Sequence, residues 1–530
     1  MLSYSEQNGL VCDYVDLQIL MVADWHGQLE TKSLYNGDQL GGAAVLSAYF
    51  QAERQQNPNT VVVFAGDSYG ASPPLASFFE EQPVVEAMNL MGVDADALGN
   101  HSFDRGIEHV QTMAERAGYP FLGANVEGAE QSISCPSKAD SACVEPYYAA
   151  WVGGVRVGVV GLLTPDTPNL VKPGAMGTAK VTDPIAAAAD AKQELEARGA
   201  QVLVASAHMG VDRSEGEPTG ALVDLAQGVP GFDAVLGGHT HLDLAQEVGD
   251  TMVVETASGG MAYARIQLRY EFASHQVVER SAEIVVADAT AVTPDAAVED
   301  LLAPYRTNLA ARFDTPIGVA TGTFERGDNV ERLGEVPIGN LVADALRVRY
   351  GTDIGFVNGG GLRAPLPSDY APQDLSLRRL GAEYAAGPPF DLVIGDVYSV
   401  LPFGNVTVTR TVTGEQLWAM VEHGVSALPA PVGFFGQVSG IRVVFDSSQP
   451  AGSRVVELSL DDTTPVAPDD TAYTLATSDF LAAGGDGYAM LADGDGVPRD
   501  KLAEVVMTHI QQLGTIDPSV EGRLVDVASP

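Results

Sequence analysis

The sequence has little positive charge. Its 29 lysines and arginines, of which only six are lysines, face 70 aspartates and glutamates, so the formal net charge at pH 7 is −41. Such a surface repels phosphate backbones and anionic lipid headgroups. A protein that binds nucleic-acid polymers or membrane surfaces by general electrostatic attraction is therefore excluded. Any small anion that binds here must be held by a local group of positive charges.

Long apolar runs and cysteines are also few. No run of about 18 apolar residues occurs, so no membrane-spanning helix is expected. The first residues lack the basic segment and the apolar core of a signal peptide, so none is visible. Cys135 and Cys143 flank a polar loop, where a short disulfide and two free thiols both stay open, and Cys12 is left over. From this cysteine spacing we expect an extracytoplasmic protein, either periplasmic, secreted or on the cell surface.

Short apolar runs alternate with helical patterns between residues 17 and 285. Continuous aliphatic runs are typical of strands buried on both faces, and their alternation with helices predicts βαβ units. Two later runs, Thr251–Glu255 and Ala264–Phe272, have no helix between them and are expected to be antiparallel. The earlier runs are Leu17–Ala23, Thr60–Ala65, Ala95–Leu98, Val155–Leu163, Val202–Ala207 and Ala234–Leu236.

A second α/β pattern follows a small, polar linker. A helix is predicted over Ala296–Phe313, and further helices over Gly339–Tyr350 and Thr413–Ala427. One of the expected strands covers Val438–Phe445. With 530 residues of globular composition, the chain has room for two to four domains, and two fit best. We expect domains over residues 1–286 and 316–530, joined by a linker and connecting helix over 287–315.

Polar motifs follow five of the apolar runs in the first half. In open α/β sheets, ligands bind at the carboxyl ends of the strands, so these motifs are expected to meet at one site. They are Asp24-Trp25-His26-Gly27, Gly66-Asp67, Gly99-Asn100-His101-Ser102-Phe103-Asp104, His208-Met209-Gly210 and Gly237-Gly238-His239-Thr240-His241.

The residue types in these motifs are those of a metal site. Alternate residues of an extended segment project to one side, so Asp24 with His26, and His239 with His241, are each expected to reach one centre. Carboxylates, an amide oxygen and imidazoles suit divalent Zn, Mn, Fe, Co or Ni, and they outnumber the ligands of one ion, so two metal ions are predicted. The other histidines lack such neighbours and are expected to be ordinary polar residues: His109, His275, His423 and His509.

The motifs resemble those of the calcineurin-like metallophosphoesterases, and within them the 5′-nucleotidase and UDP-sugar hydrolase group. The resemblance implies a four-layer α/β/β/α sandwich joined by a helix to a C-terminal α/β substrate domain. It also implies that Asp67 bridges two metals. One metal is then held by Asp24, His26, Asp67 and His241, and the other by Asp67, Asn100, His208 and His239.

The same resemblance gives two residues a role in catalysis. It implies that His101 is the catalytic histidine and that Asp104 orients it. Two divalent ions activate water and neutralise charge in the displacement at phosphorus, while a histidine stabilises phosphoryl oxygens or protonates the leaving group. Phosphoester hydrolysis is therefore expected. Ala23 and Ser102 depart from the family pattern, where Asn and Glu are frequent, but neither is an implied ligand.

Glycine-rich segments of the second half carry arginine and phenylalanine. A glycine-rich turn ahead of an arginine can cradle an anion, and exposed phenylalanines can stack on a planar base. The resemblance implies that four residues hold the phosphate and ribose side, two phenylalanines sandwich the base, and one aspartate bonds the ribose hydroxyls. The segment from 358 to 363 is one residue longer than the family motif. In that order the implied residues are Arg332, Asn358, Gly360, Arg363, Phe403, Phe480 and Asp486.

The leading expectation is a dimetal 5′-nucleotidase for nucleoside 5′-monophosphates, with nucleoside di- and triphosphates and UDP-sugars as further substrates. A 2′,3′-cyclic-nucleotide 2′-phosphodiesterase/3′-nucleotidase would use the same metal ligands and stays an alternative. A thiosulfohydrolase would leave the stacking motifs without a purpose. A non-catalytic nucleotide-binding protein is disfavoured because every ligand position is filled. The metal, among Zn, Mn and Co, and the oligomeric state stay open.

Overall fold

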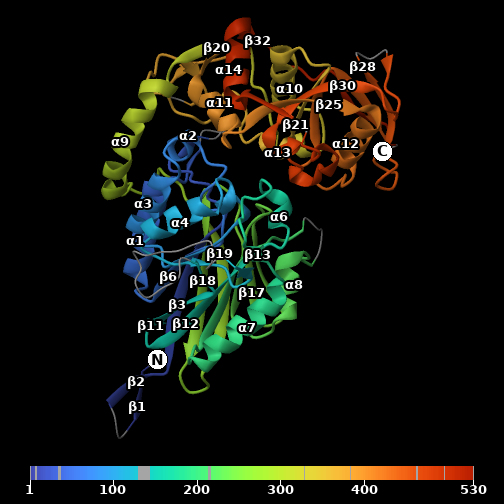
Figure 1. Cartoon of the computed structure of the whole chain (residues 1–530). Coiled ribbons are helices and arrows are strands. Elements are labelled where there is room, and N and C mark those ends of the chain that lie inside the picture. Colours follow the sequence, from blue (N-terminus) through green and yellow to red (C-terminus); the bar gives the residue numbers. More distant parts are fainter. Residues whose placement is uncertain are drawn as a thin grey trace. The chain divides into compact units, whose positions relative to one another are not determined.

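The computed structural model describes residues 2–5, 9–33, 38–128, 144–212, 217–327, 329–381, 383–460, 464–494 and 496–528. Cys135 and Cys143 lie outside the described residues. The chain divides into two compact units, residues 1–306 and 307–530. The division falls within α9 (Ala296–Phe313), which occupies the residues of the expected connecting helix (Figure 1).

The first unit contains a seven-stranded and a six-stranded sheet (Figure 1). The first sheet has the order β10 (Val144–Glu145), β8 (Phe121–Leu122), β7 (Ala95–Ala97), β6 (Thr60–Phe64), β3 (Tyr14–Val22), β18 (Ala262–Glu271) and β19 (Gln276–Val286). The second has the order β11 (Tyr147–Val152), β12 (Val155–Leu163), β14 (Val202–His208), β15 (Ala234–Gly237), β17 (Thr251–Glu255) and β16 (Leu244–Val248).

The two sheets share one hydrophobic core, and helices cover their outer faces. Ile19 and Val61 of the first sheet lie in the same buried cluster as Val159 and Val204 of the second. Burial on both faces explains why these strands are aliphatic without interruption. The helices α1 (Ala43–Gln56), α3 (Gln82–Met91) and α4 (Ile107–Arg116) belong to one outer layer, and α7 (Pro184–Ala197) and α8 (Ala221–Gly228) to the other (Figure 1). The expected four-layer α/β/β/α sandwich is confirmed.

Strand direction brings the strand ends together. In the first sheet β3, β6 and β7 are parallel neighbours, and in the second β12, β14 and β15 are. The expected antiparallel strand over Ala264–Phe272 is confirmed, since β18 runs antiparallel to β3. The same expectation for Thr251–Glu255 is wrong with respect to β15, because β17 pairs with β15 in parallel. The intervening strand β16 lies at the sheet edge and turns back into β17, which restores the direction of β15.

The second unit is built on a five-stranded sheet with cores on both faces. Its order is β26 (Gly436–Ser439), β21 (Ile354–Asn358), β30 (Ala472–Ser478), β25 (Val406–Thr413) and β31 (Val497–Lys501). Val357 packs in the core that includes α10 (Pro337–Tyr350) and α14 (Leu502–Leu513). Its neighbour Phe356 packs in the core of α12 (Gly414–Val425), as the alternation of a strand requires.

One expected strand of the second unit is broken in two. Val438–Phe445 divides at Gly440 into β26 and β27 (Ile441–Phe445), which belong to different sheets. Gly440 has a φ of 79°. A Cβ at this position would lie 2.1 Å from the carbonyl oxygen of Asp353, so only glycine fits the turn. The four-stranded sheet of β27 also contains β28 (Val455–Leu460), β29 (Thr464–Pro465) and β33 (Leu524–Asp526).

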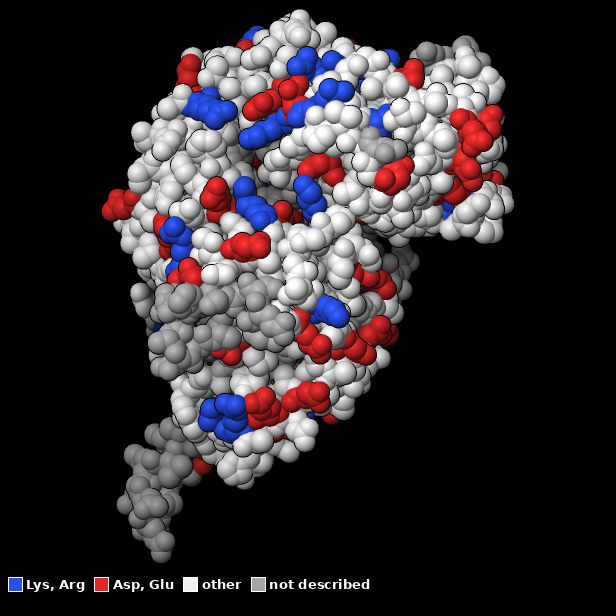
Figure 2. Space-filling view, viewed as in Figure 1, with Lys and Arg blue, Asp and Glu red and all other residues white. Residues whose placement is uncertain are grey.

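Charge on the surface is mixed. On the face shown in Figure 2, blue Lys and Arg side chains are scattered, and several lie beside red acidic ones. The ion pairs of the described residues show the same mixing: Arg269 is 2.7 Å from carboxylate oxygens of both Asp16 and Glu279. As far as the described residues reach, this face has no broad positive area for a polyanion. A helix suited to crossing a lipid bilayer does not occur in the described part of the chain.

Candidate functional site

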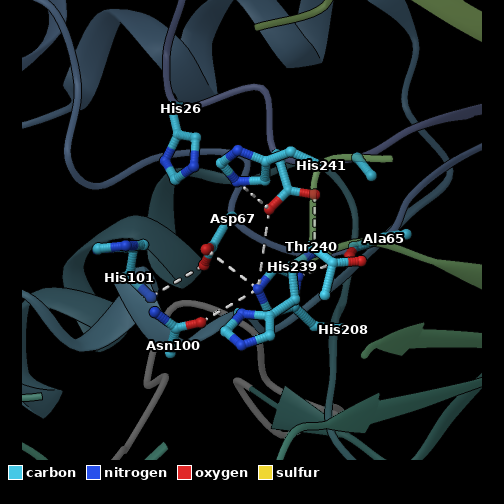
Figure 3. Close-up of polar contacts among 12 residues, drawn as sticks. His26, Ala65, Asp67, Asn100, His101, His208, His239, Thr240 and His241 are labelled. Atoms are coloured by element: carbon cyan, nitrogen blue, oxygen red, sulfur yellow. Dashed lines mark hydrogen bonds and ion pairs between the residues drawn. The ribbon is translucent and has the colours of Figure 1, made fainter. Parts of the chain in front are cut away.

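The strand-end motifs of the first unit meet in one place. Asp24 follows β3, Asp67 follows β6, Asn100 begins a short helix after β7, and His208 ends β14. Figure 3 shows Asp67 between His101 and His208, with Asn100 beside the His208 ring. Two groups have potential ligand atoms that all lie within 4.8 Å of one another: Asp24, His26 and His241, and Asp24, Asp67 and His208. The carboxyl ends of parallel strands thus bring the motifs together, as expected.

Left-handed backbone aims the ligands. The extended geometry expected for Asp24 with His26 and for His239 with His241 is wrong, because their φ angles are 49°, 51°, 79° and 57°. Asp67 adopts the same region at 48°. Such conformations cost about 1–3 kcal/mol each for residues other than glycine and persist only where the surroundings enforce them. Here the carbonyl oxygen of Asp67 accepts the backbone N–H of His26 at 2.8 Å. The pairs converge through tight turns and not through strand pleating.

Backbone carbonyls fix the orientation of two imidazoles. Nδ1 of His208 lies 3.0 Å from the carbonyl oxygen of Ala65, and Nδ1 of His26 lies 2.8 Å from that of Gly70. A carbonyl can only accept, so Nδ1 carries the proton and Nε2 is left to act as a metal ligand. Nε2 of His208 faces Asp67 Oδ2 at 3.0 Å and Asn100 Oδ1 at 3.2 Å.

The electrostatics of the cluster favour a cation. Burial alone would lower the pKa of His208, but the carboxylates of Asp67 and Asp24 outweigh it and raise that pKa to about 9. Burial and the positive charge of His208 lower the pKa of His239 to about 3, so that imidazole is neutral and suited to coordination. Asp24 Oδ1 is buried and accepts no hydrogen bond from the described residues, although His241 Nε2 lies 3.2 Å away. This donor set fits divalent metal ions.

The geometric groups differ in detail from the implied ligand sets. Asp24 belongs to both groups, whereas the resemblance assigns it to one metal only. His239 belongs to neither, and its ring centre lies 5.2 Å from that of His208 in an edge-to-face arrangement. The division of the seven residues between two metals stays a prediction.

His101 and Asp104 form the expected pair beside the cluster. Nδ1 of His101 lies 3.0 Å from both carboxylate oxygens of Asp104, and the side chain of His101 is 18% exposed. The backbone N–H of His101 donates to Asp67 Oδ1 at 2.9 Å, so the same carboxylate ties the histidine to the cluster. Because Asp104 accepts from Nδ1, the pairing fixes the tautomer and the ring orientation of His101.

In the second unit, four of the expected substrate residues lie together. Asn358 ends β21, and its Nδ2 donates to Asp486 Oδ2 at 2.7 Å. Gly360 donates its backbone N–H to the carbonyl oxygen of Gly433. A Cβ at Gly433 would lie 3.7 Å from Asp486 Oδ2, so Gly433 is a neighbour of that carboxylate. Asp486 also interacts electrostatically with the guanidinium of Arg332.

The two phenylalanines that are expected to stack on the base, Phe403 and Phe480, lie in separate segments of this unit. The Cζ of Arg363 is 5.9 Å from the ring centre of Phe403, a cation–π arrangement. Phe480 lies in α13 (Asp479–Ala482), and a Cβ at Gly485 would come within 2.3 Å of its ring. Phe480 therefore packs directly on the turn that carries Asp486. The stacking of a base between both rings stays a prediction.

Sequence reasoning missed three residues around these sites. Glu331 is fully buried, with Oε1 2.7 Å from Arg326 and 3.5 Å from Arg332, and no sequence signal marks it. Nε2 of His423 donates to the carbonyl oxygen of Asp486 at 2.7 Å, so this histidine has a partner that its helical pattern did not reveal. Glu255 is buried at the end of β17. Glu255 comes at the end of an apolar run, as the other motifs do, and this position in the sequence could have identified it.

Two family matches cover most of the chain. Residues 17–243 match the calcineurin-like phosphoesterases, and residues 316–493 match the 5′-nucleotidase C-terminal domain. The 5′-nucleotidase of Homo sapiens is 28% identical over 555 residues, which cover 96% of this chain and 90% of that protein. The endonuclease YhcR of Bacillus subtilis is 27% identical over 493 residues, which cover 90% of this chain but only 38% of that protein.

Solved structures agree with these matches. The 5′-nucleotidase precursor from Thermus thermophilus superimposes with a TM-score of 0.83 at 27% identity, covering 97% of this chain and all of that one. The sulfate thiohydrolase SoxB of the same organism, with a TM-score of 0.74 and 18% identity over 97% of each chain, shares the fold. The chain therefore belongs to the calcineurin-like phosphoesterases that carry a 5′-nucleotidase C-terminal domain, a family of hydrolases acting on phosphoric esters.

Proposed function

We propose that this chain is a dimetal 5′-nucleotidase that releases phosphate from nucleoside 5′-monophosphates. The observation that carries the proposal is the coexistence of two sites in one chain. The first unit has the buried Asp24, Asp67 and His208 cluster, and the second has Asn358 and Asp486 joined beside Arg332. A metal cluster alone supports phosphoester hydrolysis in general, and the second group supports a nucleoside as the part that is recognised.

The metal ligands in this proposal are Asp24, His26, Asp67, Asn100, His208, His239 and His241. Two divalent ions such as Zn, Mn or Co, when bound, would polarise a phosphoryl oxygen and lower the pKa of a water molecule. Backbone carbonyls orient the imidazoles of His26 and His208 without any bound ion, so the protein would supply these two ligands in a fixed orientation.

His101 is proposed as the catalytic histidine. Its Nε2 would donate a hydrogen bond to a phosphoryl oxygen or a proton to the leaving oxygen of the nucleoside. Asp104, 3.0 Å from Nδ1, fixes the tautomer and stabilises the imidazolium form. A nucleoside leaving group would be recognised by the second unit, with Phe403 and Phe480 on the base, Asp486 on the ribose hydroxyls, and Arg332, Asn358, Gly360 and Arg363 on the phosphate and ribose side.

Phosphate release from a small substrate panel tests the function. The panel contains AMP, 2′,3′-cyclic AMP, ADP, UDP-glucose and single-stranded DNA, each with and without a chelator. For the cyclic nucleotide and the DNA, the products are also separated by chromatography, because hydrolysis of a phosphodiester releases no free phosphate. We expect AMP to give the highest kcat/KM and DNA to give none, because the surface charge of −41 opposes a polyanion. Faster hydrolysis of cyclic AMP would favour the phosphodiesterase alternative. Cleavage of DNA would instead place the chain with the endonuclease YhcR, whose name states that activity.

An extracytoplasmic location is part of the proposal. It is supported by the relative named as a cell wall protein in Listeria monocytogenes, which is 25% identical over 90% of this chain. Fractionation of the source cells, with the activity assayed in each fraction, tests it. Activity confined to the cytoplasm would contradict it.

A further inference from the structure

Glu255 lies where two ligand-bearing loops meet. It ends β17, the strand next to β15 in the second sheet, and its side chain is fully buried. One loop follows directly after His208, the last residue of β14, and the other follows β15 and carries His239 and His241. Glu255 belongs to none of the sequence motifs of the metal site. It is too far along the chain to belong to either loop.

The carboxylate of Glu255 bonds to both loops at once. Oε2 accepts the backbone N–H of Val211 at 2.9 Å, three residues after His208. Oε1 accepts the backbone N–H of Leu242 at 3.2 Å, next to His241. Oε1 also lies 2.7 Å from Oγ1 of Thr240, the residue between the two histidines. A carboxylate can accept on both oxygens, so one side chain satisfies donors from two loops.

The loops have no room to adjust independently. A Cβ at Gly210 would lie 2.0 Å from Oγ1 of Thr240, so the backbone of one loop packs directly on the side chain of the other. Gly238 donates its N–H to the carbonyl oxygen of Met209 at 3.1 Å. His239 and His241 have left-handed backbone conformations. Such conformations persist only where neighbouring groups hold them, so the loop that carries both histidines needs a rigid support.

The next residue supports the loop that carries Asp24. Oγ1 of Thr256 accepts the backbone N–H of Ala23 at 3.2 Å, directly before Asp24. Three residues later, Gly259 donates its N–H to the carbonyl oxygen of Asp24 at 2.8 Å. The segment from Glu255 to Gly259 therefore contacts ligand-bearing loops of both sheets: that of Asp24 in the first, and those after β14 and β15 in the second.

We infer that Glu255 is a positioning residue of the metal centre, which ties the loop of His208 to the loop of His239 and His241 and so holds these imidazoles at a common centre. This inference rests on the proposed metal-dependent function. Glu255 belongs to neither of the groups whose potential ligand atoms lie together. Its effect is expected in metal affinity, because the imidazoles would have to be drawn together at binding if the link were broken.

The test is a metal titration of Glu255→Gln. Glutamine keeps the size of the side chain but has a single acceptor oxygen, so one backbone N–H, of Val211 or of Leu242, loses its partner. The metal-free full-length chain and its variant are titrated with Mn²⁺ by calorimetry, and the metal retained after dialysis is measured by mass spectrometry. We expect Mn²⁺ to bind roughly 10- to 100-fold more weakly in the variant, the usual effect of losing an outer-shell partner.

Glu422→Gln is the matched control. In α12 of the second unit, Glu422 accepts backbone N–H groups of Gly452 and Arg454 on Oε1 and of Val455 on Oε2, so it too bonds a loop through both oxygens. This variant is expected to lower the melting temperature and to leave Mn²⁺ affinity unchanged. An equal loss of affinity in both variants would show a general effect of stability and would overturn the inference.

Thr240→Val keeps the test decisive if Glu255→Gln does not fold. Valine removes the hydroxyl that contacts Glu255 and Val211 while it preserves the branched shape. A 3- to 10-fold loss of Mn²⁺ affinity is expected, roughly the effect of one hydrogen bond. Unchanged affinity in the folded variants would overturn the positioning role alone. A wild-type chain that binds no Mn²⁺ or Zn²⁺ would instead overturn the proposed function.

Discussion

The two candidate sites of this molecule are built differently. The metal cluster of the first unit consists of side chains at strand ends, with Asp24, Asp67 and His208 at most 2% exposed. The proposed base-stacking and ribose residues of the second unit, Phe403, Phe480 and Asp486, lie on turns and a short helix and are only half-buried. The first site is assembled before any ligand arrives, while the second leaves surface for a ligand to cover.

This difference separates catalysis from selectivity. Changes at the buried cluster are expected to reduce turnover of every phosphoester, because the chemistry there does not depend on the leaving group. Changes at the half-buried turns are expected to alter only substrates with a base and a ribose. The comparison would fail if both kinds of change affected nucleotides and simple aryl phosphates alike.

Removal of the metals is expected to have the largest effect. A chelator should lower phosphate release from both AMP and p-nitrophenyl phosphate by roughly 1,000-fold or more, since a metal supplies several kcal/mol of transition-state stabilisation. Addition of Mn²⁺ or Zn²⁺ should restore both activities together. Activity that survives exhaustive chelation, with metal content measured on the same sample, would show that the cluster is not catalytic.

His101→Ala comes next in size. The side chain is proposed to transfer a proton or stabilise charge without binding a metal, so kcat should fall roughly 100- to 10,000-fold on both substrates. Metal content should stay at the wild-type value. If metal is lost together with activity, His101 is a ligand, and the pair with Asp104 would need a new interpretation.

The base-stacking prediction concerns the other site. Phe403→Ala combined with Phe480→Ala should raise KM for AMP roughly 5- to 100-fold, because stacking on an aromatic ring contributes about 1–3 kcal/mol per base. Hydrolysis of p-nitrophenyl phosphate should be spared. An equal loss on both substrates would refute the stacking role and would blur the separation between the two sites.

Much of the metal site could be predicted from the sequence, and its geometry could not. Apolar runs ending in Asp, Asn and His motifs are visible in one dimension, and parallel strands bring their ends together. The left-handed turns at Asp24, His26 and His239 leave no such trace, because these residues rarely adopt positive φ unless tertiary contacts enforce it. The parallel pairing of β17 was also hidden, since direction depends on the path of β16.

The second site was less accessible to sequence reasoning for a physical reason. Glycine-rich turns and a Phe beside Pro occur at many positions that bind nothing, so they carry information only through a resemblance. Contacts such as that between Asn358 and Asp486, 128 residues apart, depend on tertiary structure, because β21 pairs with β30, the strand that precedes the turn of Asp486. The buried Glu331 beside Arg326 and Arg332 has no periodic signal at all.

The smallest expected effect is the sharpest test of how the second site recognises a ribose. Asp486→Asn keeps the shape of the side chain and removes its charge, and Asn358 Nδ2 can still donate to the remaining oxygen. If Asp486 bonds the ribose hydroxyls, the wild-type chain should prefer AMP to dAMP in kcat/KM. The variant should lose that preference by roughly 3- to 10-fold, the effect of one hydrogen bond, with p-nitrophenyl phosphate unaffected. A preference for AMP that persists in Asp486→Asn would assign the ribose to another residue, and the absence of any preference in the wild-type chain would show that Asp486 does not recognise the ribose.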